Sequence, residues 1–279
     1  MPVYLNGTFL ENETACLHIS DLSIQRGYGI FDFCRVLNGI PLFLDDHLDR
    51  FYTSADAMYL PVERTREELS GIIDELIKRS SLDEAGIRIT LTGGYSPDGY
   101  TTARPNLLIT CSPVKTSALE DFEKGMSIIT YEHQRELPHI KSINYLMAVW
   151  LQPLLKESQV DDLLYYKNNI VTEFPRCNVF IVTPDNKLAT PASNILKGIT
   201  RKKVLSLAGE LMLIEERDIT IDELMNAAEV FLTATTKKLM PILKINDQVI
   251  GTGNPGPVTR KLYAQFLELE RSATHLVSL

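Results

Sequence analysis

Long apolar runs, basic tracts and targeting signals are all missing from this sequence. Charged residues interrupt every apolar stretch well before the ~18 residues that a membrane-spanning helix needs. The N-terminal MPVYLNGTFLENE lacks the basic and apolar regions of a secretory signal. The net charge is −8 without a long basic run, which argues against nucleic acid as a partner. We therefore expect a soluble cytoplasmic protein that binds neither membranes nor nucleic acids.

Cysteine and histidine are sparse and poorly placed for metal binding. The four cysteines form no CxxC pair, so we expect reduced thiols, with neither a disulfide framework nor a zinc site. The five histidines show no metal-ligand spacing, and Asp45-Asp46-His47 is typical of the solvated first turn of a helix. No metal site is predicted. The cysteines are Cys16, Cys34, Cys111 and Cys177.

The run GTGNPG at 251–256 matches the GxGxxG pattern of dinucleotide-binding loops without its context. That pattern needs a strand before it, a second strand after it and an acidic residue about 20 positions on. The short remainder of the chain after Gly256 has a helical pattern, and Pro255 and Pro257 suit a turn into that helix. We interpret the run as a turn. Neither GxxxxGK[ST] nor GxSxG occurs elsewhere.

The first part of the chain predicts an antiparallel sheet covered by two helices. Asn6-Gly7 and Asn38-Gly39 each separate two strand-like runs, which indicates β-hairpins. Apolar spacing of three and four residues predicts one helix from Leu44, extending to Tyr59, and another over 66–81. Two short strands are expected at 87–92 and 106–111.

The second part of the chain predicts a further mixed domain. Expected strands begin with MSIITYE, and expected helices cover about 199–208, 220–228 and the region from Val258 on. The polar, proline-containing stretch between the two parts suits a linker. The predicted fold class is α+β. Its predicted parts are an N-terminal domain at 1–112, a linker at 113–120 and a C-terminal domain at 121–279.

Two charged residues stand in apolar surroundings. Lys141 is the only charged residue between His139 and Lys156. A desolvated lysine can form a Schiff base with an aldehyde, although a lysine in a loop can also simply reach out to water. Glu173 lies between two apolar strands, where a carboxylate could pair with a protonated ring nitrogen or merely face solvent.

Two hydroxyl-rich turns could bind an anion. Gly198-Ile199-Thr200 stands at a predicted helix start, where backbone N–H groups and the helix dipole favour negative charge. Thr233-Ala234-Thr235-Thr236 follows a predicted strand. Threonines also cap helices for structural reasons alone. Together the turns describe a phosphate pocket, which with a lysine and a glutamate is what a pyridoxal phosphate site needs.

These residues resemble the class IV aminotransferases, the pyridoxal phosphate fold type IV group. The group contains D-amino-acid and branched-chain aminotransferases and aminodeoxychorismate lyase. The resemblance covers nearly the whole chain, in the same order. The similar segments are HLDRF at 47–51, HIKSINYL at 139–146, TEFPRCNVF at 172–180, ILKGITRKKVL at 195–205 and LTATTKKLMPI at 232–242.

The resemblance implies the role of each residue toward the cofactor. Lys141 would bond to the aldehyde of pyridoxal 5′-phosphate and then move the proton between substrate and cofactor. Glu173 would hold the pyridine nitrogen protonated. The phosphate would be bound by Arg50, Ile199, Thr200, Thr235 and Thr236.

Departures from the family pattern concern the substrate. Arg26 stands where the family usually has an aromatic substrate-pocket residue. The loop 96–100 reads SPDGY, so it lacks the arginine and histidine of the S-P-R-x-H loop that binds the substrate carboxylate in D-amino-acid aminotransferases. Arg26 and Arg88 could take over, because a guanidinium suits a carboxylate. Alternatively, Arg88 is only a charge on the outer face of its strand.

We therefore predict a homodimeric transaminase that uses pyridoxal 5′-phosphate, each active site being completed by the partner subunit as the resemblance implies. Its expected substrates are a D-amino acid such as D-glutamate or D-alanine and a 2-oxo acid such as 2-oxoglutarate or pyruvate. The alternatives are a branched-chain L-amino-acid aminotransferase, aminodeoxychorismate lyase, and a protein that binds the cofactor without catalysis.

Overall fold

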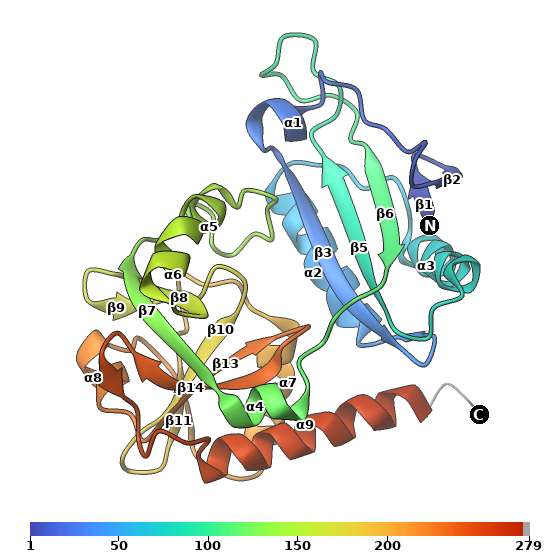
Figure 1. The fold of residues 1–279 in the computed structure, drawn as a ribbon. Helices are drawn as coiled ribbons and strands as arrows, with labels where there is room; N and C mark the ends of the chain where they lie inside the picture. The colour runs from blue at the N-terminus through green and yellow to red at the C-terminus, as the bar shows by residue number, and fades with distance from the viewer. Residues whose placement is uncertain (276–279) are drawn as a thin grey trace. The chain divides into compact units, whose positions relative to one another are not determined.

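The computed structural model describes residues 1–275 and groups them into two compact units (Figure 1). The first unit comprises Met1–Lys115, Ile140–Asn144 and residues 272–275, and the second comprises Thr116–His139 and Tyr145–Arg271. The domain limits expected from the sequence stay a prediction. The short segment that carries Lys141 thus groups with the first unit.

The first unit contains a six-stranded antiparallel sheet in the order β2-β1-β6-β5-β3-β4. The predicted Asn-Gly hairpins are confirmed, because Asn6-Gly7 and Asn38-Gly39 connect β1 to β2 and β3 to β4 with positive φ at all four residues. The strands are β1 Pro2–Leu5, β2 Thr8–Glu11, β3 Gly29–Leu37, β4 Ile40–Pro41, β5 Ala85–Thr92 and β6 Leu107–Ser112.

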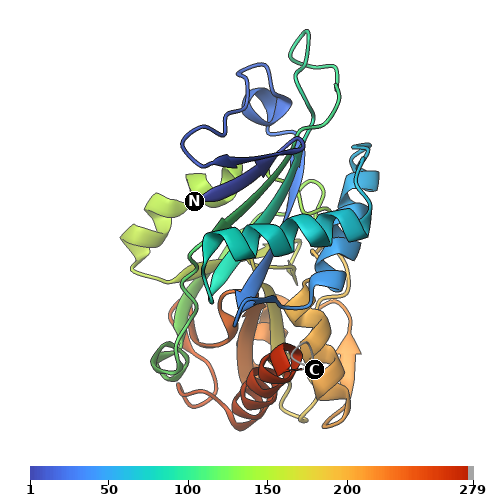
Figure 2. The same cartoon turned by 90° about the vertical axis from the view of Figure 1, so that its right-hand side faces the viewer.

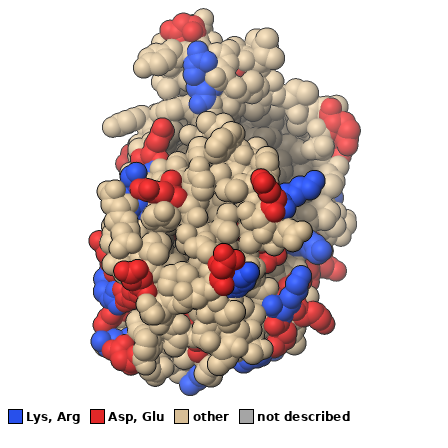
Figure 3. All heavy atoms as spheres, turned by 60° about the vertical axis from the view of Figure 1, so that its left-hand side comes forward, with Lys and Arg blue, Asp and Glu red and all other residues tan. Residues whose placement is uncertain are grey.

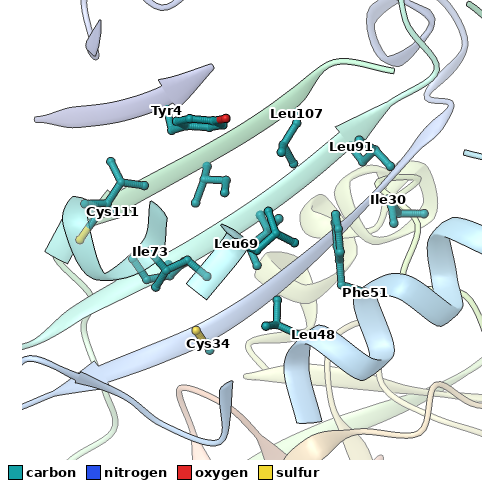
Figure 4. Close-up of a cluster of buried hydrophobic side chains, with 14 of the residues drawn as sticks. Tyr4, Ile30, Cys34, Leu48, Phe51, Leu69, Ile73, Leu91, Leu107 and Cys111 are labelled. Atoms are coloured by element: carbon teal, nitrogen blue, oxygen red, sulfur yellow. The ribbon is translucent and has the colours of Figure 1, made fainter. Parts of the chain in front are cut away.

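Two helices cover one face of this sheet (Figure 2). They are α2 Leu44–Ala57 and α3 Arg66–Ser80, as the apolar spacing predicts. The side chains packed between helices and sheet form the core in Figure 4, with Leu48 and Phe51 of α2 fully buried. Tyr59 was wrongly expected on the apolar stripe: α2 ends before it, and its side chain is 87% exposed.

The alternation of β3 sends consecutive side chains to opposite faces of this sheet. Ile30 and Cys34 belong to the core beneath the helices, so Asp32 points the same way. Phe31 points to the other face. Arg88 of β5 pairs in register with Phe33, which places Arg88 on the same face as Phe31.

The second unit contains a mixed nine-stranded sheet in the order β12-β11-β10-β13-β14-β7-β8-β9, with β15 paired to β14. Strands β7 and β8 are parallel, and β10, β13 and β14 are antiparallel neighbours. The strands are β7 Met126–Glu132, β8 Asp162–Lys167, β9 Ile170–Val171, β10 Asn178–Val182, β11 Leu188–Thr190, β12 Ile214–Glu216, β13 Glu229–Ala234, β14 Lys238–Ile245 and β15 Gln248–Val249.

The remaining helices are short except for two. No helix within residues 1–275 combines the length and apolarity that crossing a membrane requires. The helices are α1 Leu22–Arg26, α4 Leu119–Lys124, α5 Leu146–Trp150, α6 Gln152–Ser158, α7 Ile199–Gly209, α8 Ile221–Met225 and α9 Pro257–His275.

The GxGxxG run ends against a carboxylate. A Cβ added at Gly256 would lie 2.0 Å from Glu229 Cδ. Glu229 accepts hydrogen bonds from the N–H groups of Val258 and Thr259 at 3.0 and 2.8 Å, and from Thr259 Oγ1 at 2.7 Å. The N-terminus of α9 is therefore capped by an anion of the protein itself, which leaves no room for a pyrophosphate there.

Glu229→Ala should destabilise the protein by about 2 kcal/mol, because the N–H groups of Val258 and Thr259 at the start of α9 lose a charged acceptor. Urea unfolding at pH 7 measures this change. Glu13→Ala, which removes an exposed carboxylate in a turn, is the control and should change the stability by less than about 0.5 kcal/mol. Equal midpoints for the two variants would contradict the capping role.

Candidate functional site

In the first unit, the buried carboxylate of Asp32 joins two residues of α2. Asp32 Oδ2 accepts a hydrogen bond from Arg50 Nε at 2.8 Å, and Oδ1 accepts from Arg50 Nη2 at 2.8 Å. His47 Nδ1 lies 2.7 Å from Asp32 Oδ1. His47 and Arg50 are three positions apart, so both can face β3 from one side of the helix. Asp32 is 1% exposed.

Charge is balanced within this cluster. Burial by itself would raise the pKa of Asp32, but the Arg50 guanidinium and the hydrogen bonds from Arg50 and His47 hold it well below its usual range. Burial lowers the pKa of His47 despite the opposing pull of Asp32. His47 is therefore neutral at pH 7, and its Nδ1–H donates to the carboxylate.

Arg50 keeps donors for a second anion. A guanidinium has five N–H donors, and the pair with Asp32 uses two of them. The Arg50 side chain is 12% exposed. A guanidinium that is oriented by a carboxylate in this way suits a phosphate.

Both main-chain polar groups of Lys141, the carbonyl and the N–H, form hydrogen bonds within the first unit. Its carbonyl accepts a hydrogen bond from Phe31 N at 2.9 Å, and its N–H donates to Ser54 Oγ of α2 at 3.3 Å. Its Nζ lies 4.5 Å from the centroid of the Phe31 ring. Its charge also opposes protonation of His47 and helps to lower the pKa of that imidazole. Lys141 thus lies beside the Asp32 cluster.

Arg88 meets the same aromatic ring. Arg88 Cζ lies 4.2 Å from the centroid of Phe31, so the structure brings Arg88 and Lys141 together on one side chain. Arg88 does lie on the face of the sheet away from the helices, as the outer-face alternative expected. That face is also where Lys141 Nζ lies.

In the second unit, both carboxylate oxygens of Glu173 are bound. Arg135 Nε donates to Oε1 at 2.9 Å, and Leu196 N donates to Oε2 at 2.8 Å. Glu173 is 4% exposed and lies between β9 and β10 rather than on a strand. An arginine partner keeps a carboxylate ionised. A buried, ionised carboxylate is the kind of group that can hold a protonated ring nitrogen.

The loop after Leu196 leads into a helix start that no side chain caps. Asn178 Nδ2 donates to Leu196 O at 2.7 Å, and Gly198 N donates to Asn178 Oδ1 at 3.2 Å. A Cβ at Gly198 would lie 2.2 Å from Asn178 Oδ1, so a larger residue there would displace the Asn178 side chain from these hydrogen bonds. Gly198 is the N-cap of α7 and lacks a capping side chain, which leaves the amides of Ile199 and Thr200 for an anion.

The threonine-rich turn connects β13 to β14. Thr233 pairs in register with Asn178, and its buried Oγ1 has no hydrogen-bond partner among the described residues. Thr235 and Thr236 follow in the connection and are half-buried, with the carbonyl of Thr236 bound by Ser117 N. A buried hydroxyl without a partner is uncommon, and it fits a turn shaped around a polar group that is not part of the chain.

Arg26 remains outside both groups. It is exposed at the end of α1, where its Nη1 donates to the carbonyl of Gln25. The SPDGY loop supplies no cation: Asp98 accepts from the N–H groups of Tyr100 and Thr101. Hydrogen bonds, chiefly from Thr101, hold the pKa of Asp98 well below its usual range. Arg88 is thus the sequence-predicted arginine that lies beside Lys141.

Several partners of the predicted residues were missed from the sequence, among them Asp32, which pairs with Arg50. His47 was wrongly assigned to a solvated turn, since it is 2% exposed and bound to Asp32. The phase of α2 could have revealed it, because His47 shares a face with the buried Phe51. Arg135 gave no local signal, because Glu173 is 38 residues away in sequence. Asn178 lies in the segment TEFPRCNVF that carries the family resemblance, but no role was assigned to it.

On the face in Figure 3, acidic and basic side chains are interspersed, without a patch of basic residues alone. Within the described residues, no group of three or more His, Cys, Asp or Glu side chains could hold a metal ion.

Comparisons with known proteins agree on one family. A family profile described as "Amino-transferase class IV" matches residues 29–245. The chain is 32% identical to a D-alanine aminotransferase of Bacillus licheniformis, with 94% of each chain covered. It is 30% identical to a putative branched-chain-amino-acid aminotransferase of Methanocaldococcus jannaschii, with 96% of each covered. A branched-chain amino acid aminotransferase from T.th., solved with pyridoxamine 5′-phosphate, has a TM-score of 0.89 at 25% identity, covering 96% of this chain and 93% of that one.

His47 should make the stability of the protein depend on acid. In the folded state its lowered pKa favours the neutral imidazole, whereas an unfolded histidine titrates at about pH 6.5. Its contribution is therefore complete above about pH 6.5 and declines as the pH falls, because the unfolded chain takes up a proton first. The expected slope approaches about 1.4 kcal/mol per pH unit. Urea unfolding between pH 5 and 8 measures it.

His47→Gln keeps a donor for Asp32 but does not titrate, so its stability should fall less between pH 7 and pH 5 than that of the wild type. His18→Gln, which changes an exposed histidine, is the matched control and should follow the wild type. Parallel curves for the wild type and His47→Gln would refute the assignment.

Proposed function

The chain belongs to the class IV aminotransferases, and from that membership we propose that it moves an amino group between a D-amino acid and a 2-oxo acid. The expected partners are D-glutamate or D-alanine with 2-oxoglutarate or pyruvate. The observation that carries this proposal is the position of Arg88 beside Lys141 on the ring of Phe31. This position supports the proposal, because a guanidinium suits a carboxylate and Lys141 is the proposed reacting amine.

Pyridoxal 5′-phosphate is the cofactor of this family, and the residues present fit it. The Arg50 pair with Asp32 uses two of its five N–H donors, and the first turn of α7 has no side-chain cap. Thr233 Oγ1 is buried without a partner among the described residues, and Glu173 is a buried carboxylate held by Arg135 and the Leu196 amide. When bound, the cofactor supplies a protonated ring that accepts the electrons released as a proton leaves the substrate Cα.

Each residue of the chain then has one task. Lys141 Nζ would hold the cofactor at its aldehyde and would carry the proton that leaves the substrate Cα. Glu173 would accept the hydrogen bond of the ring nitrogen and keep it protonated. The phosphate would be held by Arg50, Ile199, Thr200, Thr235 and Thr236.

Arg88 and Arg26 are proposed to bind substrate carboxylates. The family's S-P-R-x-H loop is replaced here by a loop whose Asp98 is bound to its own backbone, so the carboxylate needs another cation. A guanidinium beside the reacting amine suits a 2-oxo acid and favours a second carboxylate, as in 2-oxoglutarate. The D preference draws its support from relatives such as the Bacillus licheniformis protein.

A branched-chain L-amino-acid aminotransferase is the second candidate. It is favoured by the 30% identity to the Methanocaldococcus jannaschii protein. Such an enzyme needs an apolar pocket for its side chains, whereas the group beside Lys141 in this chain is a guanidinium.

The enzyme is also proposed to act as a homodimer in the cytoplasm. Arg26 supports the first part, because it is exposed in this chain while the family pattern assigns its position to a substrate pocket. The cytoplasmic location is supported by the wide spacing of the four cysteines without a CxxC pair, which is typical of thiols in a reducing compartment.

The absorption spectrum of the purified protein tests the cofactor and the stereochemistry together. The band of the lysine-bound cofactor should collapse to that of the amine form when D-glutamate is added, and should persist with L-glutamate or L-leucine. If the band collapsed with the L-amino acids alone, the protein would be a branched-chain L-amino-acid aminotransferase instead. A band that no amino acid changes would indicate aminodeoxychorismate lyase. Lys141→Ala is the control and should lack both the band and turnover.

Arg88→Ala should raise the KM for 2-oxoglutarate by about 10- to 100-fold, because a charged hydrogen bond to a carboxylate contributes about 1.5–3 kcal/mol. Steady-state kinetics with D-alanine as the donor measure this change. Arg79→Ala, which removes an exposed helix arginine paired with Glu75, is the control and should leave KM unchanged. If Arg88→Ala and Arg26→Ala both retained the wild-type KM, neither arginine would bind the acceptor.

A further inference from the structure

We propose that Phe31 is a positioning residue whose ring holds the cationic groups of Lys141 and Arg88 together. It thereby fixes the separation between the reacting amine and the group that receives the substrate carboxylate. The part that concerns Arg88 rests on the proposed function, whereas the part that concerns Lys141 does not.

The ring has two cations in contact distance. Lys141 Nζ and Arg88 Cζ lie 4.5 and 4.2 Å from its centroid, both within the range of cation–π attraction. Phe31 is 6% exposed, so little water competes for the ring. Two positive groups that share a neighbour repel each other, and the negative face of the ring offsets that repulsion.

The backbone makes this arrangement specific to Phe31. Phe31 N donates to the carbonyl of Lys141, and Ile143 N donates to the carbonyl of Gly29, so residues 141–143 run along the start of β3. The ring and the lysine are therefore fixed relative to each other by main-chain bonds as well as by their side chains.

Phe33 provides an internal comparison. It lies two residues further along β3 on the same face, but its ring packs against Gly86, where an added Cβ would lie 2.5 Å from Phe33 Cζ. Phe33 therefore has a packing role, while Phe31 contacts the two cations. A substitution at Phe31 removes a ring together with its contacts to the two cations, whereas the same substitution at Phe33 removes a ring that makes a packing contact instead.

The direct test measures how reactive the Lys141 amine is in full-length protein freed of cofactor. Trace labelling with acetic anhydride at pH 8, read by mass spectrometry relative to Lys156, reports the fraction of free amine. Phe31→Leu keeps an apolar side chain but removes the π face that favours the ammonium form. Lys141 should then be labelled about five-fold faster, which corresponds to about 1 kcal/mol of lost cation–π attraction.

Two variants serve as controls. Phe31→Tyr keeps the ring and should restore wild-type labelling, and Phe33→Leu should leave it unchanged. Wild-type labelling in a folded Phe31→Leu protein, or equal acceleration in Phe31→Tyr, would overturn the proposal. If Phe31→Leu does not fold, 3,4,5-trifluorophenylalanine at position 31 keeps the shape and weakens the π face, and should still accelerate labelling at least two-fold.

Kinetics of the holoenzyme test the Arg88 part. Phe31→Leu should raise the KM for 2-oxoglutarate at least three-fold, and Phe31→Tyr should restore it. Faster labelling of Lys141 without a change in KM would support the part of the proposal that concerns Lys141 and would refute the part that concerns Arg88. Inactivity toward every D-amino acid would refute the proposed substrate and would not alter the labelling result.

Discussion

The buried carboxylate of Asp32 is the constraint on which the first unit's candidate site depends. A carboxylate that is 1% exposed must be neutralised and hydrogen-bonded, or folding would cost several kcal/mol. Arg50 and His47 meet that requirement from one side of α2. In doing so they fix α2 on the sheet and aim the remaining N–H groups of Arg50. The same packing places Ser54 where it binds the backbone of Lys141.

Glu173 repeats this arrangement in the second unit. Arg135 balances its charge, and the amide of Leu196 binds its other oxygen. The amide of Leu196 belongs to the loop that leads through Gly198 into α7. The hydrogen bond therefore fixes the Glu173 carboxylate and also the loop before the uncapped start of this helix. In each unit a buried carboxylate thus positions a guanidinium and a backbone segment together, which is how a rigid polar site is built on regular elements.

Local patterns predicted much of the fold and only part of the site. Helices α2 and α3 follow from apolar periodicity, and the hairpins follow from Asn-Gly pairs, because both depend on neighbouring residues. Asp32 and Arg50 are 18 residues apart in sequence, and Arg135 and Glu173 are 38 apart. The patterns of neighbouring residues that predict helices and turns therefore do not reveal either pair. Lys141 and Glu173 stood out because each is charged among apolar neighbours.

Arg88 shows why strand alternation could not decide its role. The pattern of Ile87, Arg88 and Ile89 correctly assigns the arginine to the face away from the core. A side chain on that face is functional only if another segment arrives there, and that depends on residues 141–143 pairing with the start of β3. The pairing puts the Lys141 amine on the ring that Arg88 already contacts. The outer-face charge and the proposed carboxylate-binding group are therefore the same residue. What separates the two readings is a contact between parts of the chain more than 50 positions apart.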